Sequence, residues 1–274
     1  MIRRTEHRNM KRNYQENFFT LYTSFQSHDR RLEKGRKIHF TLTQFCKEDL
    51  KTRTCLDVGC SAGVITSYLR PLFHKMIGLD YDPVGLGLIT PEQKQEVGFM
   101  RGDAMNLPLE DESVDVVICA QVYEHVPDDE RLFQEIERVL RPGGIVFFSG
   151  PNKLFPIELH HNLPFLQWLP PRWANRYVQL LGKGNEFYEY SRTLGDLRKV
   201  LKGFDIYDVT VPVLRFFAHE RQGFKRQVYR AFSKAPRWVK HLVAWLTPNF
   251  NWVLVKKTDP HLPSRYTLVE FFEE

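Results

Sequence analysis

The sequence from Thr54 to Thr66 reads Thr-Cys-Leu-Asp-Val-Gly-Cys-Ser-Ala-Gly-Val-Ile-Thr. Its first half is apolar and ends on Asp57 and Gly59, which is typical of a buried parallel strand. Its second half passes through Gly63 into apolar residues at helical spacing. A strand that turns tightly into a helix brings backbone N–H groups to the carboxyl edge of a sheet, where nucleotide-like ligands bind in open α/β folds. This stretch therefore predicts a ligand-binding loop at the centre of an α/β domain.

The segment from Asp57 to Gly63 resembles the first motif of the class I S-adenosylmethionine-dependent methyltransferases, which reads acid-x-Gly-x-Gly-x-Gly. Ser61 stands where the family usually has its second glycine. The dinucleotide fingerprint Gly-x-Gly-x-x-Gly is absent, because the next glycine after Gly59 is Gly63. A nicotinamide-dependent enzyme is therefore the weaker interpretation.

Further acids follow at the ends of the next predicted strands. Asp80 ends an apolar run 21 residues after Gly59, an offset that suits a carboxylate binding a ribose diol. Asp103 ends a third strand and resembles the family residue that accepts from the adenine amino group. The passage Gln121-Val-Tyr-Glu-His125-Val-Pro-Asp, a helix over 128–140 and a fifth strand over 145–148 match the family in order and spacing. The closest resemblance is to methyltransferases of the small-molecule, quinone- and sterol-pathway type.

This resemblance implies a Rossmann-like, seven-stranded α/β sheet, mostly parallel, with an antiparallel hairpin at one edge and helices on both faces. The last two strands are expected over 204–214 and 251–257. We expect a basic arm (1–13), a methyltransferase domain (14–257) and a C-terminal tail (258–274). The domain includes N-terminal helices (14–53), an acceptor cap (153–190) and a basic insertion (215–250). The N-terminal helices either close over the cofactor, as in related enzymes, or only pack against the sheet.

The expected cofactor is S-adenosylmethionine, whose sulfonium methyl is itself electrophilic, so the protein mainly has to align the acceptor with it. The residues expected to bind the cofactor are Asp57, Gly59, Cys60, Ser61, Gly63, Asp80, Tyr81, Asp103, Ala104 and Gln121. A base is needed only where the acceptor must lose a proton. The candidates are His125, after the fourth strand, and His160 and His161 in the cap. Each histidine is also explained as a residue that only fixes its own loop.

The cap contains ten large apolar or aromatic residues interleaved with four prolines. It follows the fifth strand, where related enzymes build the acceptor pocket, so we expect its aromatic side chains to line that pocket. The expected substrate is therefore a small, partly apolar or lipid-linked acceptor.

Positive charge is concentrated near the end of the chain. Residues 215–257 carry ten Lys or Arg against Glu220 alone, a net of +9, whereas the whole chain of 274 residues has +6. Aromatic residues at helical spacing in this segment predict basic amphipathic helices. These helices either pack on the domain with a solvated rim or, through 215–245, dock on an anionic membrane surface.

Other patterns bound the class of protein. No apolar run approaches the ~20 residues of a membrane span, and the basic N-terminus has no apolar segment behind it, so no secretory signal is predicted. The four cysteines, Cys46, Cys55, Cys60 and Cys119, lack the paired spacing of a metal site, and no metal is expected. We interpret them as reduced thiols of a cytoplasmic protein, peripheral on the inner face of a membrane if the basic segment docks there.

Two other functions stay open. A nucleic-acid (RNA) methyltransferase would use the basic arm and insertion, but these carry no recognised nucleic-acid motif, and the Asn-Pro-Pro-Tyr type signature is missing. The other alternative is a protein that binds S-adenosylmethionine without catalysis, although nothing in the cofactor loop looks broken. The sequence does not determine the acceptor, the methylated atom (O, N or C) or the oligomeric state.

Overall fold

The computed structural model describes residues 18–21, 27–46, 49–220, 227, 235–236, 238–239, 245–259, 261 and 263–269, the side chains of 21 and 217–220 excepted. The expected basic arm (1–13) and most of the basic insertion lie outside this part. Among the described helices, none is both long enough and apolar enough to cross a membrane.

An eight-stranded sheet forms the centre of the fold, in the order β10-β8-β9-β5-β4-β1-β2-β3. Its strands are β1 (Thr54–Val58), β2 (Lys75–Asp80), β3 (Gly98–Arg101), β4 (Val114–Ala120), β5 (Leu140–Pro151), β8 (Phe204–Asp208), β9 (Asn249–Lys256) and β10 (Tyr266–Leu268). Within this sheet β9 pairs antiparallel with β5 and β8, and the other pairings are parallel. The expected α/β fold, mostly parallel with an antiparallel element near one edge, is confirmed.

Two details of the predicted edge are wrong. The sheet has eight strands instead of seven, because Tyr266–Leu268 of the expected tail pairs in parallel with β8 as β10. The strand expected over 204–214 ends at Asp208, and helix α10 (Thr210–Glu220) follows it. A short apolar run such as Val209 to Leu214 does not distinguish a buried strand from a buried helix by its periodicity. Pro212 lies in the first turn of α10, where a helix tolerates the missing N–H.

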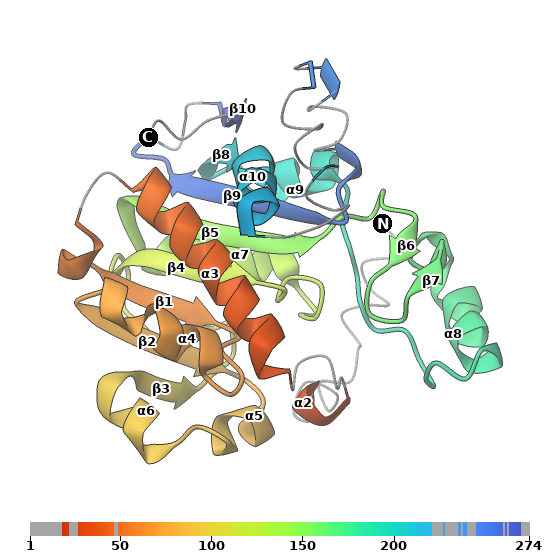
Figure 1. Ribbon diagram of the computed structural model, residues 1–274, viewed down its shortest axis with the longest axis horizontal. Coiled ribbons are helices and arrows are strands. Elements are labelled where there is room, and N and C mark those ends of the chain that lie inside the picture. Colours follow the sequence, from red (N-terminus) through yellow and green to blue (C-terminus); the bar gives the residue numbers. More distant parts are fainter. Residues whose placement is uncertain are drawn as a thin grey trace.

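Helices cover both faces of the sheet, as expected. The remaining α-helices of the main domain are α2 (Phe18–Leu21), α3 (His28–Phe45), α4 (Val64–Leu69), α5 (Pro83–Gly87), α6 (Pro91–Glu96), α7 (Asp129–Val139) and α9 (Leu194–Val200). In Figure 1, α3 and α4 lie in front of the sheet and α7 lies behind it.

The alternation of side chains along the strands explains this layering. Along β4, Val116 and Ile118 belong to the apolar cluster beneath α3 and α4, whereas Val117 and Cys119 belong to the cluster beneath α7 and α9. Successive residues of a strand point to opposite faces, and a sheet covered on both faces needs apolar residues at every position. The core therefore consists of two apolar layers separated by the sheet.

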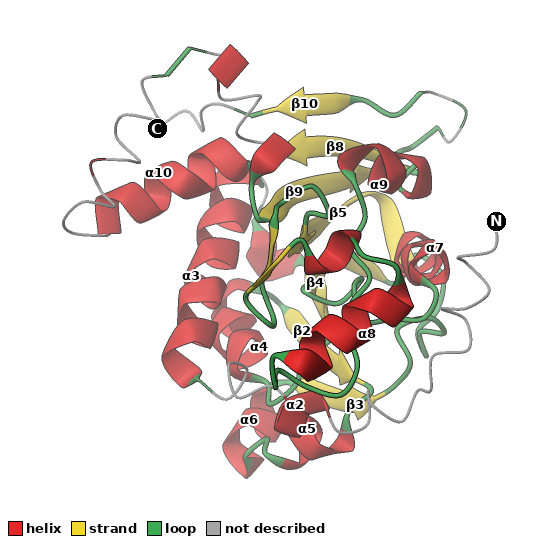
Figure 2. Ribbon diagram, turned by 90° about the vertical axis from the view of Figure 1, so that its right-hand side faces the viewer, coloured by secondary structure: helices red, strands yellow, loops and turns green. Residues whose placement is uncertain are grey.

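The cap (153–190) is a small unit beyond the carboxyl ends of β4 and β5 (Figures 1 and 2). It consists of the two-stranded pair β6 (Ile157–Glu158) and β7 (Leu163–Pro164), a 3-10 turn at Leu166–Trp168 and helix α8 (Pro171–Leu180). Ala174 and Val178 of α8 are fully buried against Leu163 and Leu166. The cap thus has its own apolar cluster next to the main domain.

Candidate active site

The loop after β1 adopts the left-handed backbone conformation at alternate residues. The φ angles are +76° at Gly59, +52° at Ser61 and +69° at Gly63. Glycine adopts such angles without steric cost, which explains the glycines that the related motif uses at these positions. A Cβ at residue 59 would also lie 2.7 Å from a methyl carbon of Val122, so this position has no space for a side chain.

Ser61 replaces the usual glycine and makes specific contacts in exchange. Its backbone N–H donates to Oδ2 of Asp80 over 2.6 Å, and its hydroxyl oxygen accepts from Nη2 of Arg31 over 3.1 Å. A non-glycine residue in the left-handed region persists only where its surroundings hold it. The serine therefore links the loop to β2 and to α3.

Two carboxylates flank this loop. Asp57, 4% exposed, accepts a 2.7 Å hydrogen bond from the hydroxyl of Thr66. Burial raises the pKa of Asp57 to about 7, although the bond from Thr66 opposes the shift. Burial also raises the pKa of Asp80, against hydrogen bonds from the backbone N–H groups of Asp82 and Ser61. A ligand that supplies positive charge or hydrogen-bond donors would therefore stabilise the ionised form of both acids.

A cavity of about 260 Å³ lies over the ends of β1, β2 and β4. Nine of the ten residues expected to bind the cofactor line it, namely Asp57, Gly59, Cys60, Ser61, Asp80, Tyr81, Asp103, Ala104 and Gln121. Gly63, the tenth, precedes the first residue of α4 and shapes the turn instead. The cavity gathers these residues in one place, and their role in binding stays a prediction.

The N-terminal helices provide wall residues that the sequence did not single out. Phe18 of α2 and Arg30, Arg31 and Lys34 of α3 line the cavity. The same helix α3 packs Ile38 and Leu42 into the core, and closure of these helices over the cofactor stays a prediction. Arg31 is only 7% exposed, and burial lowers its pKa, while Asp57 and Asp80 oppose that shift. A lone arginine in a polar helix gives no local signal of this placement.

His125 lies on the wall of this cavity. Its ring packs edge-on against Phe18, with 4.5 Å between ring centroids. Burial lowers the pKa of His125 well below its ordinary value, so the imidazole is neutral near pH 7. The neighbouring Glu124 is fully buried, and burial raises its pKa to about 7. Of the three histidines expected as candidate bases, His125 is thus the one that lines this first cavity.

The two cap histidines share one carboxylate but face different ways. Glu158 is 3% exposed, and Nδ1 of His160 lies 2.8 Å from its Oε1, while Nδ1 of His161 lies 3.1 Å from its Oε2. Although burial opposes ionisation, hydrogen bonds from both histidines hold the pKa of Glu158 below its ordinary range. The ring of His160 meets that of His125, with centroids 5.1 Å apart, whereas the ring of His161 packs against that of Phe187.

A second cavity of about 220 Å³ adjoins the first and shares Lys34, Ala120 and Gln121 with it. The other residues that line it are Lys37, Ile38, Phe147, Ser149, Leu159, His160 and Asn249. His160 therefore reaches this space, whereas His161 lines neither cavity.

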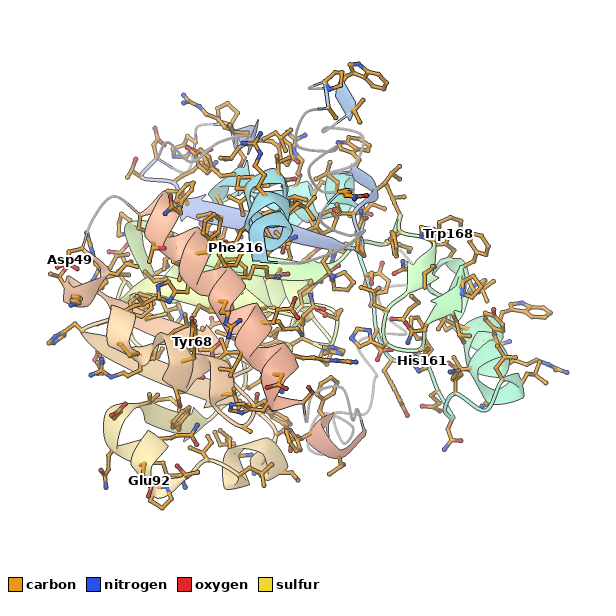
Figure 3. All side chains as sticks on the ribbon, viewed as in Figure 1. Asp49, Tyr68, Glu92, His161, Trp168 and Phe216 are labelled. Carbon is orange, nitrogen blue, oxygen red and sulfur yellow. The ribbon has the colours of Figure 1, made fainter. Side chains whose placement is uncertain are left out.

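The aromatic side chains of the cap line neither cavity, and their expected place in the acceptor pocket stays a prediction. Phe165, Trp168 and Trp173 are 51%, 48% and 65% exposed, and Trp168 points away from the sheet (Figure 3). From the cap, only Leu159 and His160 contribute to the two cavities. On α8, Ala174 and Val178 face the apolar cluster of the cap, whereas Trp173 and Leu180 face outward.

Comparison with known proteins identifies the domain. Residues 56–148 match the family described as "Methyltransferase domain". A phthiotriol/phenolphthiotriol dimycocerosates methyltransferase of Mycobacterium tuberculosis is 39% identical over 164 residues, which cover 58% of this chain and 59% of that protein. A probable S-adenosylmethionine-dependent methyltransferase of Mycolicibacterium smegmatis is 37% identical over 102 residues, 37% of this chain and 39% of that one. The chain thus spans about two to three fifths of the length of these relatives.

Solved structures agree on the fold. An S-adenosylmethionine-dependent methyltransferase from Mesorhizobium loti superposes with a TM-score of 0.53 and 18% identity, covering 79% of this chain and 96% of that one. The cyclase SpnF superposes with a TM-score of 0.51 and 19% identity, covering 82% and 81%. Fold alone therefore does not determine the reaction. The first motif of this chain, the acids at its strand ends and the sequence match agree, and residues 56–148 are a methyltransferase domain of the class I S-adenosylmethionine-dependent type.

Proposed function

We propose that this protein transfers the methyl group of S-adenosylmethionine to a lipid-linked acceptor. The observation that carries the proposal is the set of three acids, Asp57, Asp80 and Asp103, at the carboxyl ends of neighbouring strands around one cavity. Polar groups that differ in partner and burial can recognise different parts of one elongated ligand. The sulfonium group supplies an electrophilic methyl when the cofactor is bound.

The residues of the cavity fit this cofactor. The buried carboxylate of Asp57 suits the ammonium group, and the guanidinium of Arg31 suits the carboxylate of the methionine moiety. Asp80 can accept from the ribose hydroxyls, and Asp103 can accept from the adenine amino group. Gly59 leaves the backbone open to close approach by the ligand, since no side chain shields it.

The second cavity supports the proposal as the place for the acceptor. It meets the cofactor cavity at Gln121, which directly follows β4 and has a φ of +63°. Ile38, Phe147 and Leu159 make the wall of this cavity only partly apolar, because Lys37 also lines it and donates to Oδ1 of Asn251 over 2.9 Å. Such a mixed lining suits the polar end of an otherwise apolar molecule.

The outer face of the cap supports a lipid-linked acceptor at a membrane surface. On α8, Trp173 and Leu180 are 65% and 73% exposed and lie two turns apart on one face. Arg176 is exposed one turn from Trp173, and α8 contains no acid. Exposed aromatic and aliphatic residues beside cations are typical of helices that lie in a membrane interface. The relatives named for phthiotriol dimycocerosates methylation also favour a lipid acceptor.

The expected docking segment 215–245 falls mainly outside the described residues. Of its side chains, Trp238 and Trp245 are 70% and 50% exposed. These residues favour the same role as the exposed face of α8. We therefore include in the proposal a peripheral attachment to the inner, anionic face of a membrane in the cytoplasm.

A methyl-transfer assay tests the proposal. Purified protein is incubated with S-adenosylmethionine carrying a labelled methyl group and with three acceptor pools: a total lipid extract, water-soluble quinols and structured RNA. We expect label in the lipid pool, found by mass spectrometry as a lipid heavier by one methylene. Label in RNA would replace the proposal by the nucleic-acid alternative. Calorimetric binding of S-adenosylmethionine with no label in any pool would favour the non-catalytic alternative.

A further inference from the structure

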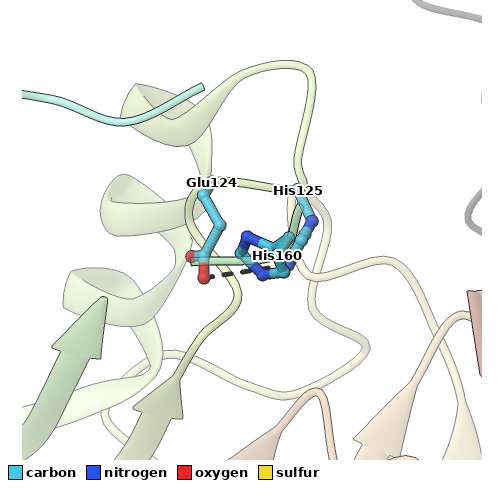
Figure 4. A group of neighbouring side chains, drawn as sticks. All are labelled: Glu124, His125 and His160. Carbon is cyan, nitrogen blue, oxygen red and sulfur yellow. Dashed lines mark ion pairs between the residues drawn. The ribbon is translucent and has the colours of Figure 1, made fainter. Parts of the chain in front are cut away.

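Three side chains with metal-binding atoms meet where the two cavities adjoin. Glu124 and His125 belong to the loop after β4, and His160 belongs to the cap (Figure 4). One potential ligand atom from each lies within 4.8 Å of the others, and Oε1 of Glu124 is 3.7 Å from Nε2 of His125. Two imidazoles and one carboxylate in such proximity form a donor set that binds divalent transition metals.

Glu124 is the member of this group that most needs a partner. Its side chain is fully buried, and within the described part of the chain no hydrogen-bond donor reaches either carboxylate oxygen. A buried carboxylate without donors is costly, and such groups are rare in native structures unless an ion or a function explains them. A cation held between the carboxylate and the two imidazoles would remove this cost.

His160 is oriented in the way that metal-bound histidines are. Its Nδ1 lies 2.8 Å from Oε1 of Glu158, and its backbone N–H donates to the same oxygen over 2.9 Å. Because an ionised carboxylate only accepts, Nδ1 carries a proton, so in the neutral ring that binds a metal the lone pair is on Nε2. Carboxylate–histidine–metal arrangements use this contact to fix the tautomer and the ring direction.

We propose that Glu124, His125 and His160 bind one divalent transition-metal ion, with Zn²⁺ as the best match. Zinc takes nitrogen and oxygen ligands at about 2.0–2.2 Å, which places neighbouring ligand atoms about 3.3 Å apart in a tetrahedron. In the structure the three potential ligand atoms are at most 4.8 Å apart, so each pair has to move closer by about 1.5 Å or less. Small rotations of the side chains are sufficient for this movement. Three protein ligands leave the fourth position open, as in catalytic zinc sites.

The place of this site connects it with the acceptor. His125 lines the cofactor cavity and His160 lines the second cavity, so the metal stands between the two spaces. An acceptor hydroxyl at the open position would ionise more readily: its O–H bond breaks, the electron pair stays on oxygen and the proton passes to water. This consequence rests on the proposed function and makes the acceptor an alcohol or phenol. The metal site itself does not depend on it.

Zinc binding to the full chain tests the inference. Protein freed of metal with a chelator is titrated with ZnCl₂ in a calorimeter, and bound metal is counted by mass spectrometry after gel filtration. We expect one zinc per chain in the wild type. Glu124→Gln and His160→Gln should each weaken zinc binding by more than the roughly 10–100-fold that loss of a supporting carboxylate costs. Glu158→Gln should itself show that 10–100-fold loss.

His161→Gln is the matched control, because His161 contacts the same Glu158 but lies outside the ligand group. It should bind zinc as the wild type does. Absence of stoichiometric zinc in the wild type, or equal affinities in His160→Gln and His161→Gln, would overturn the inference. Titration with S-adenosylhomocysteine, run on the same metal-free samples, reports folding and the cofactor site separately. If Glu124→Gln does not fold, the two histidine variants decide the question.

Discussion

Replacing Asp57 by Asn is expected to stabilise the folded protein at pH 8 while it weakens cofactor binding. The carboxylate is buried in the wall of the cofactor cavity and accepts a hydrogen bond from Thr66. Burial raises its pKa from 3.8 to about 7, with the hydrogen bond opposing. The free protein therefore holds an acid whose ionised form is unfavourable in its place, and a ligand ammonium group would relieve this cost.

The pKa shift sets the magnitude. A rise of about three units corresponds to about 4 kcal/mol, because each unit represents about 1.4 kcal/mol. Between about pH 4 and 7 the folded protein keeps a proton that the unfolded chain has released. The free energy of unfolding therefore falls as the pH rises through this window, and above pH 7 the full cost is present. Asn cannot ionise, so Asp57→Asn should gain up to about 4 kcal/mol at pH 8 and nearly nothing at pH 4.

Urea unfolding of the cofactor-free protein, followed by circular dichroism at pH 4.5 and pH 8, measures this difference. Asp115→Asn is the matched control, because Asp115 is a buried acid of the opposite kind. Although burial opposes ionisation, hydrogen bonds from the backbone N–H of Thr54 and from Arg141 hold its pKa below the ordinary value. Asp115→Asn should therefore lose stability at pH 8. A gain for Asp57→Asn that is equal at both pH values, or no gain at pH 8, would refute the reasoning.

Two further expectations concern the cofactor and the membrane. Asp80→Ala and Asp103→Ala should each weaken S-adenosylmethionine binding by roughly 1.5–3 kcal/mol, the range for lost hydrogen bonds to a charged group. If either variant shows wild-type affinity in a calorimetric titration, that residue does not belong to the site. Trp173→Ala with Leu180→Ala should reduce flotation with anionic vesicles, because apolar insertion and charge attraction act together at a membrane interface. Leu88→Ala removes a 53% exposed leucine outside the cap and should float like the wild type; equal flotation of all three proteins would contradict docking through α8.

The sequence by itself determined the centre of the fold and predicted which acids line the first cavity. The run from Thr54 to Thr66 contains the complete strand β1, the turn and the start of helix α4, and its glycines occupy positions where the φ angle is positive. Local periodicity and backbone sterics act within a few residues, so they can be read directly from the chain. Asp57, Asp80 and Asp103 followed, because parallel strands bring their carboxyl ends to one edge of the sheet.

Only the tertiary structure decided which distant side chains meet. Arg31 precedes the loop by almost thirty residues, and a helix pattern does not show that its guanidinium contacts Ser61. His125 and His160 are separated by a whole helix and strand, yet the cap sets their rings 5.1 Å apart. His161, beside His160 in sequence, turns to the other side. Such contacts depend on how the cap, the helices and the sheet pack together. Packing is determined by the shapes and burial of side chains from the whole chain, and a local sequence pattern contains no information about them.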